Sequence, residues 1–139
     1  MVTNYVTQAA QDMPEDKYAY RPTPEVRSFG ELIGHVAGAQ NMICAAALGE
    51  PQPAEDAVEK AAKTKEALIQ ALRQSTEYCN RAFSQADAAT RAPTTLFGRE
   101  TTRFHALVLN ATHNGEHYGN LVTYLRINGI VPPSSRQGM

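Results

Sequence analysis

The clearest helical signal in the chain lies at residues 28–49, which read SFGELIGHVAGAQNMICAAALG. Ser28 is followed three positions later by Glu31, which is the capping-box pattern, in which each side chain satisfies a free backbone N–H at the start of a helix. After this start, apolar residues recur at steps of four and three, at Leu32, Val36, Ala39, Ile43 and Ala47. The pattern predicts an amphipathic helix that ends before Gly49.

Three further stretches have apolar residues at helical spacing, and prolines separate them. The first is short, from about Val2 to Asp12; the next runs from about Ala54 to Gln85, and the last from about Thr101 to Asn128. No stretch of any length has a strand pattern. Because four helices that are each apolar on one side bury those sides best against each other, we expect an all-α four-helix bundle with a short first helix, as one domain over residues 1–139.

The apolar stripes predict which side of each helix faces the core. In the 54–85 helix the predicted stripe is Val58, Ala61, Lys65, Leu68, Leu72, Thr76, Cys79 and Phe83. In the 101–128 helix it is Phe104, Val108, Ala111, Gly115, Tyr118, Val122 and Leu125.

The composition argues against several classes of protein. The 13 basic and 14 acidic residues give a formal net charge of −1 and are spread along the chain, so we expect no nucleic-acid partner. No stretch reaches the roughly 18 apolar residues of a membrane helix, and the N-terminus has no signal-peptide run, so we expect a cytoplasmic protein with no membrane partner. Cys44 and Cys79 form no close-spaced pair, and we predict free thiols in a reducing compartment.

Three of the four histidines have a spacing that suits a metal site. His113 and His117 are four residues apart, so on a helix they stand one turn apart on the same side, with Cβ atoms about 6 Å from each other. His35 lies beside the apolar stripe of the 28–49 helix, with Gly34 and Gly38 on either side of it. Glycines cost helix stability, and their presence indicates that something near His35 requires close approach or open space.

This donor set indicates one divalent metal ion with open coordination positions. Three neutral imidazoles on two facing helices leave at least one position for water or substrate, which is typical of reactive sites. The segment HNGEH at 113–117 has Asn114 where the zinc-peptidase helix has its glutamate, so a peptidase is excluded. His105 falls on the polar side of its helix and is left out. The residues alone leave open the alternative that these histidines bind nothing and are simply hydrogen-bonded beside the core.

Three segments together resemble a known family. They are RPTPEVRSFGELIGH at 21–35, HNGEHYGNLVTYLR at 113–126 and GIVPPSS at 129–135, and they resemble the DinB (damage-inducible) family over nearly the whole chain. The resemblance implies a four-helix bundle, commonly a homodimer, whose three histidines hold a divalent metal such as zinc or nickel. By match of position, these ligands would be His35, His113 and His117.

The resemblance also implies a function. Relatives include transferases that use bacillithiol, mycothiol or glutathione, so we expect a metal-dependent transferase that acts on a small-molecule thiol and an electrophilic substrate. Asn110 and Tyr124, on the histidine side of the last helix, are candidates to line its pocket. Two alternatives are a metal-dependent hydrolase of a small ester or amide and a non-catalytic metal-binding protein of the stress response.

Two features depart from the family pattern. The first helix is shorter than usual, so either a dimer partner covers the gap or the chain has its true start upstream. The family has an up-down-down-up helix order, whereas the short link around residues 49–53 indicates a simple hairpin between the second and third helices.

Overall fold

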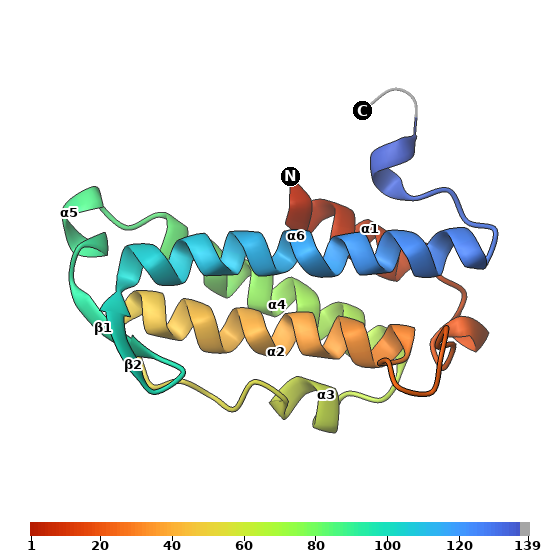
Figure 1. The fold of residues 1–139 in the computed structure, drawn as a ribbon, viewed down its shortest axis with the longest axis horizontal. Coiled ribbons are helices and arrows are strands. Elements are labelled where there is room, and N and C mark those ends of the chain that lie inside the picture. The colour runs from red at the N-terminus through yellow and green to blue at the C-terminus, as the bar shows by residue number, and fades with distance from the viewer. Residues whose placement is uncertain (137–139) are drawn as a thin grey trace.

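The computed structural model describes residues 1–136, in which four main helices lie side by side (Figure 1). They are α1 (Val2–Asp12), α2 (Phe29–Leu48), α4 (Lys65–Phe83) and α6 (Arg103–Ile127). The smaller elements are α3 (Ala57–Ala61), α5 (Asp87–Thr90), strands β1 (Pro93–Leu96) and β2 (Arg99–Thr102), and the 3-10 turns η1 (Glu15–Lys17) and η2 (Pro133–Ser135). The prediction of an all-α helical bundle with a short first helix is confirmed. Among the described residues, no helix combines the length and the apolar character needed to cross a lipid bilayer.

The central helix is α2, almost all of whose residues are buried. Its start is capped as predicted, because the Ser28 hydroxyl accepts from the Glu31 N–H at 3.2 Å and the Glu31 carboxylate accepts from the Ser28 N–H at 2.6 Å. Gly49, with φ of 74°, ends the helix in the left-handed conformation that glycine adopts without strain. Both predicted ends of this helix are therefore confirmed.

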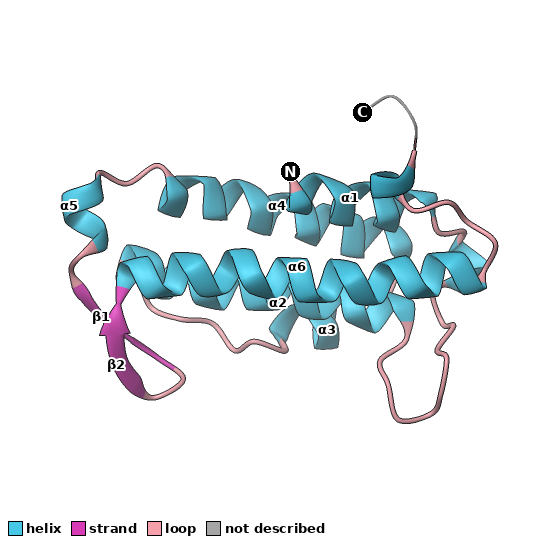
Figure 2. Cartoon of the chain, turned by 45° about the horizontal axis from the view of Figure 1, so that its top comes forward, coloured by secondary structure: helices cyan, strands magenta, loops and turns pink. Residues whose placement is uncertain are grey.

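The helices follow an up-down-down-up order, in which α2 and α4 run parallel (Figure 1). Near the two helix starts Gly30 lies against Leu68, and just beyond the end of α4 the side-chain amide of Gln85 donates to the Ala47 carbonyl at 3.0 Å. The prediction of a simple hairpin between the second and third helices is wrong. After α2 the chain runs back alongside that helix, forms α3 on the way, and only then begins α4 (Figure 2). This is the helix order that the family resemblance implied.

The predicted continuous helix at 54–85 is also wrong. Helix α3 ends at Ala61, and α4 begins after Thr64, whose hydroxyl accepts from the Ala67 N–H at 3.2 Å. A cap of this kind starts a new helix, which lets the chain reverse direction between α3 and α4.

A short β-hairpin that was not expected precedes α6. Strands β1 and β2 pair antiparallel, and the turn between them is Phe97–Gly98, with φ values of 51° and 72°. Two central residues with positive φ are typical of tight two-residue hairpin turns. The hairpin ends at Thr102, whose hydroxyl caps α6 by accepting from the His105 N–H.

The predicted core stripe of α6 is correct only toward the end of the helix. Tyr118 and Leu125 are buried, but Phe104 is 59% and Val108 44% exposed. Phe83 of the 54–85 stripe is likewise 50% exposed. Helix α1 is too short to cover the first half of α6 and packs against the second half, where Tyr5 stacks on Tyr118. Instead, the buried face of α6 consists of Ala106, Leu107, Asn110, Asn114, Tyr118, Leu121, Tyr124 and Leu125.

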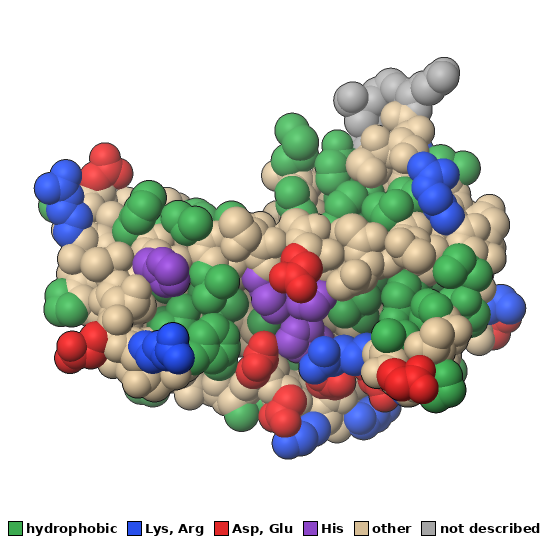
Figure 3. All heavy atoms as spheres, in the orientation of Figure 1, with side chains coloured by type: hydrophobic (Ala, Val, Ile, Leu, Met, Phe, Trp, Pro, Cys, Tyr) green, Lys and Arg blue, Asp and Glu red, His purple; other side chains and the backbone are tan. Residues whose placement is uncertain are grey.

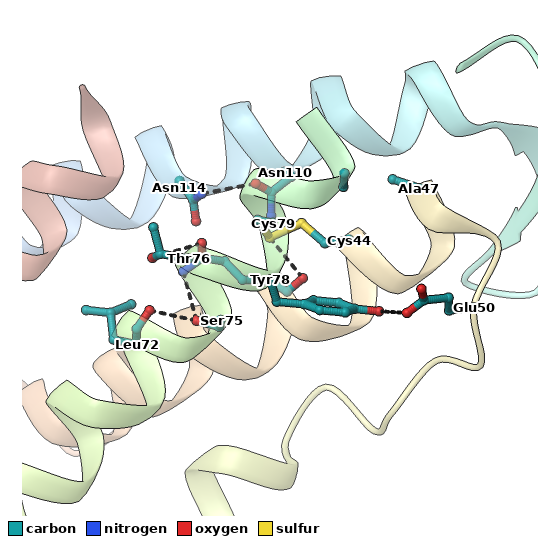
Figure 4. Close-up of a disulfide and its surroundings, with 12 residues drawn as sticks. Cys44, Ala47, Glu50, Leu72, Ser75, Thr76, Tyr78, Cys79, Asn110 and Asn114 are labelled. Carbon is teal, nitrogen blue, oxygen red and sulfur yellow. Dashed lines mark hydrogen bonds between the residues drawn. A yellow bond between two sulfur atoms is a disulfide. The ribbon is translucent and has the colours of Figure 1, made fainter. Parts of the chain in front are cut away.

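A disulfide between Cys44 and Cys79 joins α2 to α4 (Figure 4). The prediction of free thiols is therefore wrong. The parallel packing of α2 and α4 brings the two Cα atoms to 5.3 Å, within the range that a disulfide requires, although the cysteines are 35 positions apart. Both cysteines are buried, next to a polar contact in which the Gln40 amide donates to the Ser75 hydroxyl at 3.3 Å.

Candidate metal centre

Three histidines from two antiparallel helices meet midway along the bundle. Helix α2 supplies His35, and α6 supplies His113 and His117 from successive turns. The Nε2 atom of His117 lies 3.1 Å from that of His35 and 3.0 Å from that of His113. In the space-filling view these rings form one purple group at the surface of the bundle (Figure 3).

The donor set fits one divalent metal ion. Three nitrogens that each lie about 2.0 Å from a tetrahedral zinc ion are roughly 3.3 Å from each other, close to the observed separations. Without an ion, two neutral imidazoles that face each other through Nε2 can form one hydrogen bond between them. The Nε2 of the third ring then has no hydrogen bond that would explain its position. His35, His113 and His117 can therefore hold one metal ion through Nε2.

Burial keeps these histidines in the form that binds metal. Desolvation is the largest cause of a pKa lowered to about 3 for His35 and to about 4 for His117, and it also lowers the pKa of His113. The positive charge of Arg27 lowers all three pKa values further. At neutral pH the rings are uncharged, and each has a nitrogen lone pair for a metal ion.

A cavity of about 580 Å³ opens beside His117. Its lining consists of Pro22, Glu25, Val26, Arg27, Leu32, Glu59, His117, Asn120 and Tyr124. Two contacts fix Arg27 there: its Nε donates to both carboxylate oxygens of Glu59, at 3.2 and 3.3 Å, and its carbonyl accepts from the Tyr124 hydroxyl at 2.6 Å. The site thus combines three nitrogens that can hold a metal ion with an adjoining pocket and a positioned cation.

Of Asn110 and Tyr124, the two residues predicted to line a pocket, only Tyr124 lies at the cavity beside the histidines. Tyr124 lies along the cavity beside His117. Asn110 is 1% exposed and faces the interior, where its side-chain oxygen Oδ1 accepts from the Asn114 side-chain amide at 3.3 Å. It is not among the residues that line this cavity. His105 lies apart from the three histidines, beside the β-hairpin.

A model of the DinB superfamily matches residues 2–121 of the sequence. The chain belongs to the DinB superfamily. A search of curated protein sequences found no match.

Two solved structures of DinB-like proteins have the same fold. One, from Bacillus cereus, aligns with a TM-score of 0.80 at 14% identity, over 95% of this chain and 89% of that one. Another, from Bacillus subtilis, aligns with a TM-score of 0.70 at 22% identity, over 91% of this chain and 86% of that one. At these identities the likeness establishes the DinB fold alone.

Other residues of this DinB chain lie at the site but were not found from the sequence. Arg27 and Asn120 line the cavity, and Glu55, on the connection between α2 and α4, has a carboxylate oxygen 3.8 Å from Nδ1 of His35. No periodic pattern marks these positions. The one available signal was Gly38, since a Cβ there would collide with the Glu55 carbonyl oxygen.

Proposed function

We propose that this protein is a metal-dependent transferase that uses a low-molecular-weight thiol as cosubstrate. The observation that carries the proposal is the convergence of three neutral Nε2 atoms beside an open cavity. Three nitrogen ligands leave coordination positions free, as reactive metal sites require. The thiol-transfer activity that the family resemblance implies fits this arrangement.

A divalent ion at this site would supply one kind of chemistry, which is to lower the pKa of a thiol and so provide a thiolate at neutral pH. The chain's own residues would hold the ion through His35, His113 and His117 and orient the cosubstrate. Arg27 is placed to pair with a carboxylate of the thiol, because Glu59 engages its Nε while both Nη atoms make no hydrogen bond within residues 1–136. In the transfer, the thiolate sulfur forms a bond to an electrophilic carbon, whose leaving group departs with the bonding electrons.

We propose zinc or nickel as the metal, because imidazole nitrogen suits both ions. A cytoplasmic location goes with this proposal, since low-molecular-weight thiols are the reductants of that compartment. There the Cys44–Cys79 bond would face reduction, although the burial of both cysteines limits attack by a thiolate. Alkylation of free thiols in freshly lysed cells measures its state directly.

We propose a homodimer in which the partner covers the first half of α6, which α1 leaves uncovered. Phe83, Phe104 and Leu107 line a second cavity of about 580 Å³ there, and Val108 is 44% exposed nearby. In Figures 1 and 3 the outline of the molecule is indented between α5 and the N-terminus, above the first half of α6. Sedimentation of the wild type beside a Phe104→Glu variant tests this: a dimer that becomes a monomer supports the proposal, and a wild-type monomer contradicts it.

The experiment that tests the function compares the untagged protein with the triple variant His35→Ala, His113→Ala, His117→Ala. The matched control is His105→Ala, which removes a histidine outside the site. Each protein is analysed for bound metal after reconstitution with zinc or nickel. Each is then assayed with glutathione, bacillithiol or mycothiol and an electrophile, and for ester hydrolysis without thiol.

Four outcomes are decisive. About one metal per chain together with thiol transfer, both lost only in the triple variant, supports the transferase. Metal-dependent hydrolysis without thiol replaces it with the hydrolase alternative. Metal binding without either reaction leaves a non-catalytic metal protein, and full transferase activity in the triple variant contradicts any role for the metal.

A further inference from the structure

The second ring nitrogen of His35 faces a carboxylate. While Nε2 points to the other two histidines, Nδ1 lies 3.8 Å from a carboxylate oxygen of Glu55. This Nδ1 is buried and has no hydrogen-bond partner within residues 1–136. The Glu55 side chain is 38% exposed. A buried ring nitrogen therefore has one nearby acceptor that is free to move.

Two glycines of α2 explain why Glu55 lies so close. A Cβ at Gly38 would collide with the carbonyl oxygen of Glu55, and one at Gly34 would lie 2.9 Å from Cα of Glu59. Only glycine leaves room for a second backbone at such distances. The connection from α2 to α4 is thus pressed against the helix on either side of His35.

His117 has a similar arrangement at its own Nδ1. The side-chain nitrogen of Asn120 lies 3.3 Å from that atom. Rotating the amide by half a turn, which exchanges its oxygen and nitrogen, lets Asn120 accept from an Nδ1–H. The Nδ1 of His113 has no partner among the described residues. His35 and His117 therefore each have a polar group near Nδ1, whereas His113 has none among the described residues.

We infer that Glu55 is a positioning residue of the metal centre, which accepts a hydrogen bond from the Nδ1–H of His35 while Nε2 of that ring binds the ion. This inference rests on the metal site of the proposed function. A hydrogen bond needs about 2.7–3.2 Å between the heavy atoms, so the Glu55 side chain must move by less than about 1 Å. The bond fixes the tautomer and the orientation of the ring and makes Nε2 a better donor to the metal.

The test measures zinc affinity by competition with a chromophoric chelator for the wild type, Glu55→Ala and Glu55→Gln. Loss of such a partner weakens metal binding about 10–100-fold, and we expect this range for Glu55→Ala. Glutamine keeps an acceptor oxygen and restores most of the affinity. The matched control is Glu116→Ala, which removes an exposed carboxylate whose charge also acts on His113 and His117, and it changes the affinity by about twofold at most.

Two further readouts separate positioning from a structural role. The thermal unfolding of the metal-free Glu55→Ala protein stays at the wild-type value, and the ¹⁵N spectrum of the zinc-bound wild type shows His35 protonated at Nδ1. Wild-type affinity in Glu55→Ala, or an equal loss in Glu55→Ala and Glu116→Ala, overturns the inference while the metal site stands. A wild type that takes up neither zinc nor nickel overturns the metal site together with the inference.

Discussion

Nε2 of His35 lies 3.1 Å from Nε2 of His117, although 82 positions of sequence separate the two residues. Both rings are neutral at neutral pH, because burial lowers their pKa values to about 3 and about 4. In an unfolded chain a histidine has a pKa of about 6.5. Between these values the unfolded chain binds more protons than the folded one, so folding stability falls as the pH falls.

We therefore expect the metal-free protein to lose stability as the pH is lowered from about 6.5 toward 4. Urea unfolding at pH 7 and at pH 5 measures this loss. The variant His35→Gln, His113→Gln, His117→Gln should lose less between these two pH values, because it lacks the three imidazoles whose pKa values burial lowers. Parallel losses in the two proteins would show that other groups are responsible.

Replacing Arg27 should weaken the binding of a thiol cosubstrate that carries a carboxylate. Arg27 lines the cavity beside His117, and a charge-assisted hydrogen bond contributes about 1.5–3 kcal/mol. Because the Arg27 side chain is 44% exposed, solvent screening reduces this contribution, and we expect Arg27→Gln to raise the KM for glutathione roughly tenfold. The comparison is 2-mercaptoethanol, which has no carboxylate and whose KM should not change. An equal rise in KM for both thiols would mean that Arg27 supports the fold of the site and does not bind the carboxylate of the cosubstrate.

The disulfide between Cys44 and Cys79 should contribute substantially to stability. It closes a loop of 35 positions, for which the chain-entropy account gives about 4 kcal/mol. We expect Cys44→Ala, Cys79→Ala to lower the free energy of unfolding by about this amount in urea titrations. Metal content should stay at the wild-type level, since neither cysteine is a ligand. An unchanged unfolding midpoint under oxidising conditions would contradict this expectation.

Two glycine-to-alanine substitutions in this protein should change its free energy of unfolding in opposite directions. At Gly38 the new methyl group meets the Glu55 carbonyl oxygen, so backbone must shift, and we expect a loss of about 1–3 kcal/mol in unfolding free energy. At Gly115, on the exposed side of α6, no atom of residues 1–136 lies within 4 Å of an added Cβ. Alanine there should stabilise the protein by about 0.5–1 kcal/mol, because it favours the helix. Chemical denaturation of both variants checks the contrast, which fails if both substitutions have the same sign.

The parts of the fold that could be predicted from the sequence are those with local causes. The Ser28 cap and Gly49 define the ends of α2 by contacts within a few residues, and helical spacing alone placed His113 and His117 on one side. The glycines beside His35 correctly indicated a close approach, but the spacing could not identify Glu55 as the neighbour.

The errors have tertiary causes. The disulfide depends on α2 and α4 lying parallel, which no local pattern encodes. The buried face of α6 was wrongly predicted near Phe104 for two reasons. The interior side carries the polar residues Asn110 and Asn114, and α1 does not reach the first half of α6, so the apolar side there stays exposed. Each strand of the hairpin at 93–102 has only four residues, which is the shortest length at which a strand pattern can be recognised.

The parallel course of α2 and α4 also bears on how the chain folds. Neither helix pairs with a neighbour through a tight turn, so the central contacts join segments far apart in sequence, and such contacts slow folding. His35 meets His113 and His117 only after α6 has docked, and α6 is the last long helix to be synthesised. A chain that is still emerging from the ribosome therefore lacks the complete set of three histidines, and a metal ion at this site would bind only at the final step of assembly.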